Sequence, residues 1–379
     1  MRILMLNYEF PPIGGGGGQA HHCLLKEYAG NEQLRIDVLT SAPAPGFNVE
    51  DFANNITIYK VGVHKKDLHY WRRTEVIEWL AKARWHYRRL LRLHQYDLAH
   101  AFFGFPTGWL CLRTAKKLPF IISLRGSDVP GRHARLMIDY KVLGPVFKAI
   151  WKKAAVLVAV SEGLKQRALR FMPSASIEVI PNGIELDRFY PAQVKKRQEV
   201  LRLITVGRLS VTKRVQMLIE ATELLRREGY KVHLAVVGGG AMERPLKQII
   251  SQKALDGVVE IVGRVAAEDM PQLYRDSDIF VSASMQEGMS NAMLEAMASG
   301  LPIITTRCEG ADELIADNGI VLDQADAEAV AEAIIKLADD EQVYNAMCRS
   351  ARKRAEGFTW AAVAEQYLRC YQSILAIGK

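Results

Sequence analysis

Residues 281–306 read VSASMQEGMSNAMLEAMASGLPIITT, and this stretch predicts one strand–helix–strand unit. The apolar run 279–281 is typical of a buried strand, and a short polar loop follows it. Ser290 or Asn291 is suited to cap the next helix, and Gly300 followed by a proline is suited to end it. A second apolar run then starts another strand, which makes this a βαβ unit of a parallel sheet.

Two carboxylates lie near the turn from strand to helix. Glu287 is at the strand tip and Glu295 is about one turn into the helix. Their helical phases differ by ~80° at ~100° per residue, so both can face one ligand. Helix N-termini at the carboxyl ends of parallel strands present free N–H groups to anions. Phosphates bound by the backbone of 288–291 would leave the carboxylates for sugar hydroxyls, which is the geometry of a nucleotide-sugar site.

The run EGMSNAMLEAMASGLPIITT, with seven residues between Glu287 and Glu295, resembles the donor-binding signature of family 4 retaining glycosyltransferases. In that family the first Glu contacts the donor sugar and the second contacts the ribose hydroxyls. The resemblance covers nearly the whole chain and is strongest at 199–322. It implies the α/β GT-B fold, in which two Rossmann-like domains face a central cleft and a C-terminal helix crosses back to the first domain. An ordinary βαβ turn with two solvated carboxylates is the alternative interpretation.

Length and composition agree with two cytoplasmic domains. The 379 residues, of which 49% are hydrophobic, suffice for about two cores. Five scattered cysteines without a CxxC pair indicate reduced thiols, and not a disulfide or zinc framework. The first six residues are too short for a signal peptide and predict a strand. No run of ~18 apolar residues predicts a membrane span.

Alternating strand and helix patterns predict parallel sheets in both halves. In the first half, six strands are expected at 2–7, 36–39, 56–61, 97–100, 119–124 and 155–160. We expect an acceptor-binding domain at 1–190, completed by the helix 360–379, and a donor-binding domain at 199–359. Turn signals around 180–185 and a polar, unpatterned stretch near 195–199 place the boundary.

Five glycines, Gly14 to Gly18, follow the first strand and precede a helix predicted at 19–29. Successive glycines are costly in backbone entropy, so we expect a close backbone approach or unusual dihedral angles here. A phosphate or sugar at the helix N-terminus is one explanation, and a flexible surface loop is the other. The resembled family has a glycine-rich loop beside the donor phosphates and acceptor, which makes Gly16 and Gly17 donor-binding candidates.

Two basic residues enclose the first strand-to-helix loop of the second half. Arg208 and Lys213 could converge on a diphosphate, although a surface pair would be the default interpretation of the motif alone. The resembled family holds the donor pyrophosphate with an Arg and a Lys at this spacing. The turn at Arg264 borders the nucleobase in that family, so Arg264 is a further donor-side candidate.

Three residues of the first half are acceptor-side candidates, His100, Arg125 and Asp128. Family members often carry His-Gly where this chain has Arg125-Gly126, and that His lies near the reacting centre. Arg125 can bind a phosphate or orient an acceptor, but an arginine is not a base at neutral pH. His100 has the alternative interpretation of a packed histidine at a strand end.

Residues 70–94 predict a strongly basic helix. One face is apolar, and Arg73, Arg84, Arg88 and Arg92 fall mostly on another. Trp71 and Trp85 lie toward the polar side, where an exposed tryptophan is unusual. Basic faces with interfacial aromatic residues are typical of helices that bind anionic membrane surfaces, whereas a core-packed helix with a solvated face is the alternative. Residues 1–190 carry 27 Lys and Arg against 16 Asp and Glu, which agrees with any anionic partner.

Asp276-Ser277-Asp278 has the form of a metal-binding D-x-D sequence. It precedes a buried strand at its entry end, away from the carboxyl ends where ligands gather. We therefore interpret it as turn chemistry and expect no metal.

The sequence thus predicts transfer of a sugar, with retention, from a nucleotide-diphosphate sugar to a hydroxyl group. UDP is the family's commonest nucleotide, and the acceptor is expected to be a saccharide or a lipid-linked polysaccharide intermediate. Expected catalytic residues are Arg208, Lys213 and Glu287. The donor-binding candidates are Gly16, Gly17, Arg208, Lys213, Arg264, Glu287, Gly288, Met289, Ser290, Asn291 and Glu295.

No cofactor is expected besides the nucleotide-sugar co-substrate. No nucleic-acid partner is expected either, because aromatic stacking and helix-turn-helix motifs are missing from the sequence. We expect a cytoplasmic protein that is peripheral at the inner membrane face. A nucleotide-sugar epimerase or a non-catalytic nucleotide-sugar binding protein on the same fold are the alternatives.

Overall fold

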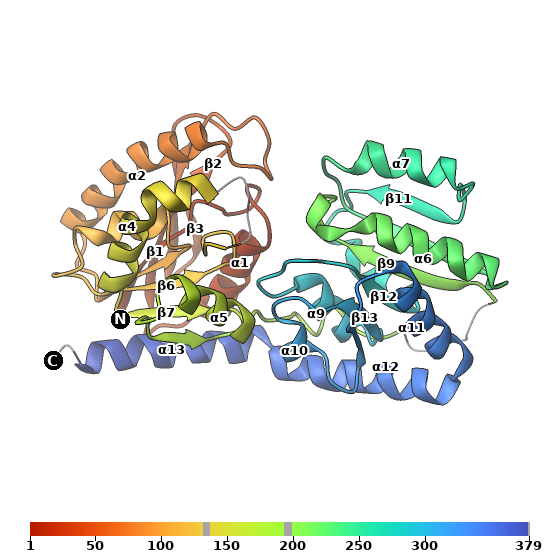
Figure 1. The fold of residues 1–379 in the computed structure, drawn as a ribbon. Coiled ribbons are helices and arrows are strands. Elements are labelled where there is room, and N and C mark those ends of the chain that lie inside the picture. The colour runs from red at the N-terminus through yellow and green to blue at the C-terminus, as the bar shows by residue number, and fades with distance from the viewer. Residues whose placement is uncertain (132–136, 193–198, 378–379) are drawn as a thin grey trace. The chain divides into compact units, whose positions relative to one another are not determined.

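The computed structural model describes residues 1–131, 137–192 and 199–377, and the chain forms two compact units (Figure 1). The first unit comprises Met1–Asn182 and Trp360–Lys379, and the second comprises Gly183–Thr359. The segment that begins at Gly183 is joined to the end of the second unit by a hydrogen bond, in which the Ile184 N–H donates to the Phe358 carbonyl at 2.7 Å. The division therefore lies before residue 190, where the sequence analysis placed the end of the first domain.

A mostly parallel, eight-stranded sheet forms the centre of the first unit in the described part of the chain, in the order β3-β4-β2-β1-β5-β6-β7-β8. The strands are β1 (Arg2–Leu6), β2 (Arg35–Ala42), β3 (Phe47–Ala53), β4 (Ile56–Gly62), β5 (Leu98–Phe102), β6 (Phe120–Leu124), β7 (Val156–Ala159) and β8 (Ile177–Val179). The six strands expected from the sequence are all present. Two further strands were not expected from the sequence: β3, which pairs antiparallel with β4 at the edge, and the three-residue β8.

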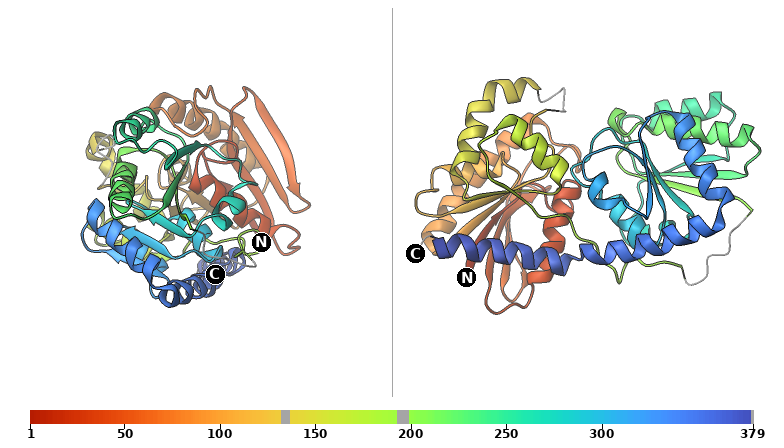
Figure 2. Two further views of the ribbon diagram at one scale, coloured as in Figure 1. Left: turned by 90° about the vertical axis from the view of Figure 1, so that its right-hand side faces the viewer. Right: turned by 60° about the horizontal axis from the view of Figure 1, so that its bottom comes forward.

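Helices cover both faces of this sheet. α1 (Gly16–Tyr28) and α13 (Trp360–Ile377) pack against each other on one face. The other helices are α2 (Arg73–Leu93), α3 (Thr107–Leu112), α4 (Met137–Lys153) and α5 (Glu162–Phe171). They connect strands in the opposite direction along the sheet, so right-handed crossovers place them on the other face (Figure 2).

Helix α2 matches the predicted basic helix, with one correction. Its apolar face is buried at Trp79, Ala83 and Tyr87, and Trp85 is exposed as expected. Trp71 was wrongly placed on the polar side of the helix. It precedes the helix start, and its ring packs edge-on against Tyr8 with centroids 4.9 Å apart.

Buried hydrogen bonds attach α13 to the first sheet. The ring of His100 is fully buried, and its nitrogens bond to the hydroxyls of Tyr371 at 2.8 Å and Ser123 at 2.7 Å. The Ser123 hydroxyl also bonds to the hydroxyl of Tyr367 at 2.7 Å. The C-terminal helix expected to return to the first domain does so, and polar groups fix its position as well as apolar contact.

The second unit repeats the α/β pattern around a parallel six-stranded sheet within its described residues, in the order β11-β10-β9-β12-β13-β14. The strands are β9 (Leu201–Val206), β10 (Val232–Val237), β11 (Val259–Gly263), β12 (Ile279–Ser282), β13 (Ile303–Thr306) and β14 (Gly319–Leu322). The helices are α6 (Val215–Arg227), α7 (Glu243–Gln252), α8 (Met270–Arg275), α9 (Asn291–Ala298), α10 (Ala311–Leu314), α11 (Ala327–Asp339) and α12 (Glu341–Ala355).

The predicted strand–helix–strand unit is β12, α9 and β13. The Ser290 hydroxyl accepts a hydrogen bond from the Met293 N–H at 3.3 Å, so Ser290 is the N-cap. Gly300 has a φ of +72° just after the helix, which favours glycine because it lies in the left-handed region. One face of the sheet packs on α6 and α11 around Leu203, Leu234 and Val236.

We predict that Tyr371→Phe destabilises the first unit by about 1–3 kcal/mol. The substitution keeps the ring but leaves the buried Nδ1 of His100 without its partner, and an unsatisfied buried group carries a cost of this size. Chemical denaturation would measure the loss. Tyr190→Phe, at a half-exposed ring of the second unit, is the control and should change little. Equal stability of the two variants would contradict the prediction.

Candidate functional site

Two loops of the second unit lie side by side at the carboxyl ends of β9 and β12. These strands are neighbours in the sheet, so the loops that leave them are adjacent. The Met285 N–H donates to the Thr212 carbonyl at 2.8 Å, and Arg214 Nε donates to the Ala283 carbonyl at 2.7 Å. Arg214 adopts a φ of +47°, an uncommon value for a residue other than glycine. The two loops therefore hold each other in position.

An ion pair between Lys213 and Glu287 joins these loops. Lys213 Nζ donates to Glu287 Oε1, and the two side chains are 23% and 15% exposed. The pair brings together a catalytic candidate from each loop, although 74 positions separate them in sequence. A diphosphate that reached Lys213 would compete with Glu287 for the ammonium group and would lie beside this carboxylate.

A small pocket adjoins the ion pair. Gly207, Arg208 and Lys213 line one side of it, and Ser282 and Ser284 line the other. Arg208 is exposed at the start of the loop, so both expected diphosphate ligands border the same space.

Glycines allow the loops after β9 and β10 to approach each other. A Cβ on Gly238, whose φ is +132°, would lie 1.9 Å from the Gly207 carbonyl oxygen. The Gly238 N–H donates to the Gly263 carbonyl at 2.7 Å, which links the turn that carries Arg264. The Arg264 side chain lies against Gly239, because a Cβ there would be 3.1 Å from Arg264 Nε. The structure thus places Arg264 at the neighbouring strand end, as the sequence analysis expected.

Glu295 has different surroundings from Glu287. Its Oε2 accepts a hydrogen bond from the Tyr274 hydroxyl at 2.8 Å. Burial raises the pKa of Glu295 to about 7, against the opposing effects of the Tyr274 hydrogen bond and of the Arg188 charge. The Glu185 carboxylate adds to the rise in this pKa. Glu295 therefore ionises at a higher pH than an ordinary glutamate.

The backbone from Gly288 to Asn291 forms the turn into α9. Ser290 and Met289 are buried, whereas Gly288 and Asn291 are partly exposed. The Ser290 side chain satisfies one N–H of the first turn, and the α9 N-terminus still presents donors of the kind that bind anions.

The side chains of Asp276, Ser277 and Asp278 form hydrogen bonds at the turn between α8 and β12, as the sequence predicted. Asp278 Oδ2 accepts from the Arg202 N–H at 2.8 Å, and Asp276 Oδ1 accepts from Gln272 Nε2 at 2.8 Å. Ser277 Oγ donates to the Leu273 carbonyl at 2.7 Å. Within residues 1–131, 137–192 and 199–377, we find no cluster of three or more His, Cys, Asp or Glu suited to a metal ion.

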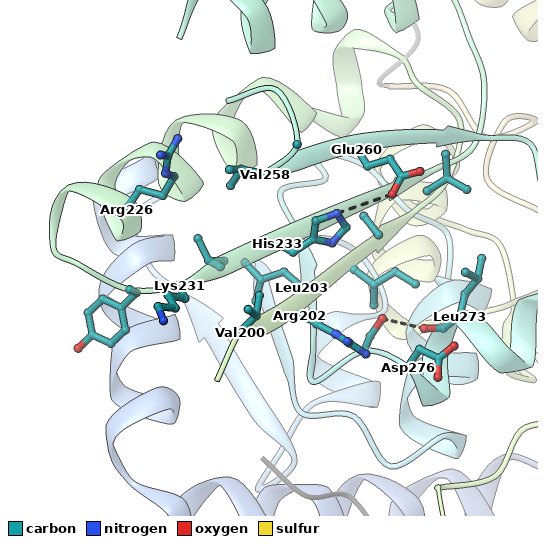
Figure 3. A pocket seen from close by; sticks show the side chains of 17 residues that line it. Val200, Arg202, Leu203, Arg226, Lys231, His233, Val258, Glu260, Leu273 and Asp276 are labelled. Atoms are coloured by element: carbon teal, nitrogen blue, oxygen red, sulfur yellow. Dashed lines mark hydrogen bonds and ion pairs between the residues drawn. The ribbon is translucent and has the colours of Figure 1, made fainter. Parts of the chain in front are cut away.

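A cavity of about 720 Å³ lies elsewhere in the second unit, along β9, β10 and β11 (Figure 3). Arg202, His233 and Glu260 share this sheet face, and His233 Nε2 is 3.7 Å from Glu260 Oε2. The short helix α8 covers only part of the face, which leaves it open. The cavity contains none of the predicted donor-binding residues, and we assign it no role in the reaction.

In the first unit, the glycine loop leads into the start of α1. The helix begins at Gly16, and a Cβ on Gly17 would lie 2.7 Å from Phe103 Cζ. Packing therefore explains part of the glycine run. The helix begins at the carboxyl end of β1, where anions commonly bind, although the Gly18 N–H donates to the Gly15 carbonyl at 3.1 Å and the Gly15 N–H to Glu9 Oε2 at 3.4 Å.

The three acceptor-side candidates have different surroundings. His100 is fully buried with both ring nitrogens bonded, and burial with the nearby His21 and Arg125 lowers its pKa well below the usual value. This geometry argues against contact between His100 and an acceptor. Asp128 accepts backbone N–H groups of Gly104, Arg125 and Gly126 at 2.7, 2.8 and 3.1 Å, so it shapes the loops. Arg125 is partly exposed, and its Nη2 donates to Asn182 Oδ1 at 2.8 Å.

A cationic stripe, which we define as Arg73, Arg84, Arg88 and Arg92, follows the outer face of α2. Ile77 and Trp85 lie in the same stripe and are 66% and 59% exposed. The charges of Arg88 and Arg113 lower the pKa of Arg84, which reports crowding of like charges on this surface. Among the described residues, no helix is both long and apolar enough to span a bilayer.

Comparisons with known proteins identify both halves. The family model "Glycosyltransferase Family 4" matches residues 15–188, and "Glycosyl transferases group 1" matches residues 187–354. A putative colanic acid biosynthesis glycosyltransferase of Salmonella typhimurium is 28% identical over 276 residues, which are 69% of this chain and 68% of that protein. The aligned part is thus about two thirds of each chain.

Solved structures share the fold of the whole chain. Sucrose-phosphate synthase from Thermosynechococcus elongatus has a TM-score of 0.85 at 22% identity and covers 100% of both chains. Anabaena HepE, in complex with UDP and glucose, has a TM-score of 0.75 at 19% identity and covers 98% of this chain and 100% of its own. These similarities show the fold, and the expected GT-B architecture is confirmed.

We predict that the free energy of unfolding of the unaltered chain, minus that of Glu295→Gln, falls as pH rises from about 4.5 to about 7. The folded state holds the Glu295 proton more tightly than the unfolded state, so its contribution is complete at low pH and is lost on ionisation. The expected loss is about 1–3 kcal/mol, since one pKa unit corresponds to about 1.4 kcal/mol. Urea titrations across this range would measure it.

Tyr274→Phe provides a second arm of this experiment. Its hydroxyl lowers the pKa of Glu295, so its removal should move the loss of stability to higher pH. Parallel pH profiles for the chain and Glu295→Gln would contradict the prediction.

Proposed function

The chain belongs to the family 4 glycosyltransferases, and from this premise we propose that it transfers a sugar, with retention, from a UDP-sugar to a hydroxyl group of a saccharide acceptor. The observation that carries the proposal is the Lys213–Glu287 ion pair between two loops at the carboxyl ends of neighbouring strands. It supports the proposal because a cation that could bind phosphate lies beside a carboxylate that could bind sugar hydroxyls.

The proposed chemistry is stabilisation of the leaving diphosphate. As the bond between the sugar and the diphosphate breaks, negative charge grows on the phosphate oxygens. Arg208 and Lys213 line one pocket of the second unit, and we propose that they and the N–H groups at the start of α9 stabilise that charge. Glu287 would position the sugar, and Glu295 the ribose. We assign no residue as a covalent nucleophile and propose that no metal takes part.

The acceptor proposal draws on the relatives. The Salmonella relative is named for colanic acid biosynthesis, and we propose by analogy that this chain extends a cell-surface polysaccharide intermediate. Such an intermediate would be lipid-linked, which agrees with a role at the inner face of the membrane.

A thermal-shift experiment with UDP, GDP, ADP and TDP, with and without EDTA, tests the donor site. A ligand at ~100 times its dissociation constant stabilises by ~2.7 kcal/mol. We expect a shift with UDP that EDTA does not change. A shift that EDTA abolishes would contradict the metal-free proposal, and no shift with any nucleotide would contradict the donor proposal and favour a protein of different function.

Lys213→Ala should weaken UDP binding by about 1.5–3 kcal/mol, the range for a charge-assisted hydrogen bond. Calorimetry would measure the affinity. Lys247→Ala is the matched control, because Lys247 is an exposed lysine of the same unit in an ion pair with Glu243. Equal affinity of the two variants for UDP would refute the diphosphate role of Lys213.

We propose that the cationic stripe of α2 binds an anionic membrane surface. Arginines supply attraction to lipid phosphates, and the exposed Ile77 and Trp85 can enter the interface. Contact with water alone does not explain why the stripe includes a tryptophan that is 59% exposed. This position would bring the first unit close to a lipid-linked acceptor.

Replacing Arg84, Arg88 and Arg92 together with Gln should weaken binding to vesicles of anionic phospholipid roughly 10- to 100-fold, since each basic residue near such a surface contributes about 1 kcal/mol. Co-sedimentation would measure binding. The charge-matched control replaces Lys336, Arg349 and Lys353, which are exposed on the second unit. Equal sedimentation of the two triple variants would refute the membrane proposal.

A further inference from the structure

We propose that Arg125 binds a negatively charged group, a carboxylate or a phosphate, on the saccharide acceptor, so that the acceptor is an anionic sugar. The inference rests on the proposed function and adds the chemical class of its acceptor.

The guanidinium of Arg125 is partly buried and uses few of its donors. Nη2 donates to Asn182 Oδ1 at 2.8 Å, and Cζ lies 6.0 Å from the centroid of the Phe102 ring. A guanidinium has five N–H donors, and within the described residues Asn182 accepts from one of them. Burial lowers the pKa of Arg125, which reports the cost of keeping this charge away from water.

Among the residues that the structure describes, two carboxylates, Asp128 and Glu9, favour the charge of Arg125. Asp128 is close enough to favour the charge, but its carboxylate accepts three backbone N–H groups and forms no ion pair with Arg125. Tyr367 also favours the charge of Arg125. The neighbouring His21 and His100 are buried, and burial lowers the pKa of both, that of His21 to about 3. A partly buried charge without an ion pair is costly, and an anionic ligand would offset this cost.

The location agrees with a saccharide ligand. Arg125 follows β6, two strands from β1 in the order β1-β5-β6, and α1 begins after β1. Arg125 and the first turn of α1 therefore belong to the same edge of the sheet, the edge at which ligands of such sheets bind.

The test compares sugars that differ in charge. Glucuronate, glucose 6-phosphate and glucose are titrated into the full chain saturated with UDP, and saturation-transfer NMR gives each affinity. We expect at least one of the anionic sugars to bind about tenfold or more tightly than glucose, a ratio equal to about 1.4 kcal/mol. Arg125→Gln and Arg125→His should abolish this ratio, and Arg125→Lys should retain part of it. Arg170→Gln, at an exposed arginine of α5, should leave it unchanged.

Two outcomes overturn the proposal: equal affinities for the three sugars in the unaltered chain, or an anionic preference that persists in Arg125→Gln. UDP affinity is measured for every variant, so a folded variant that binds UDP normally separates loss of this site from failure of the donor proposal. If UDP does not bind at all, the donor proposal fails. The sugars are then titrated into the chain without UDP, and the same comparison of affinities tests the Arg125 proposal. The acceptor assignment is also overturned if Arg125 affects only the preference for UDP-glucuronate over UDP-glucose, because the anion would then belong to the donor.

Discussion

Parallel pairing of β9 with β12 is the constraint on which the candidate donor site depends. The register Leu203 to Ile279 and Ile204 to Phe280 aligns the two strands so that both end at the same edge of the sheet. The loops after them are then held together by Met285 with Thr212 and by Arg214 with Ala283. The Lys213–Glu287 ion pair follows from this arrangement, because backbone geometry sets where the two side chains begin.

Much of this arrangement could be predicted from the sequence. Apolar runs located the central strands, and Ser290 and Gly300 marked the ends of α9 through ordinary capping chemistry. The edge strand β3 could not be found in this way, because its side chains are mostly exposed and its sequence FNVEDFA lacks a clear apolar run. Trp71 was misplaced for a related reason: a helical pattern was extended beyond the residue where the helix begins.

Side-chain environments were harder to predict than elements. Spacing placed Glu287 and Glu295 on similar helical phases, but spacing contains no information about Tyr274, which comes from another helix and bonds only to Glu295. The two carboxylates therefore differ in electrostatics as well as in position. In the same way, the sequence left His100 as an acceptor candidate until Tyr371, from the far end of the chain, was seen to bond to its ring.

That bond between His100 and Tyr371 also bears on the order of folding during synthesis. The face of the first sheet that carries His100 and Ser123 is covered in part by α13, and the ribosome produces α13 only after the entire second unit. Domains generally fold as units from the N-terminus during synthesis, but here the first unit must wait with an apolar and polar surface uncovered. The second unit is continuous in sequence, so all of its residues are synthesised before α13 is available to the first unit.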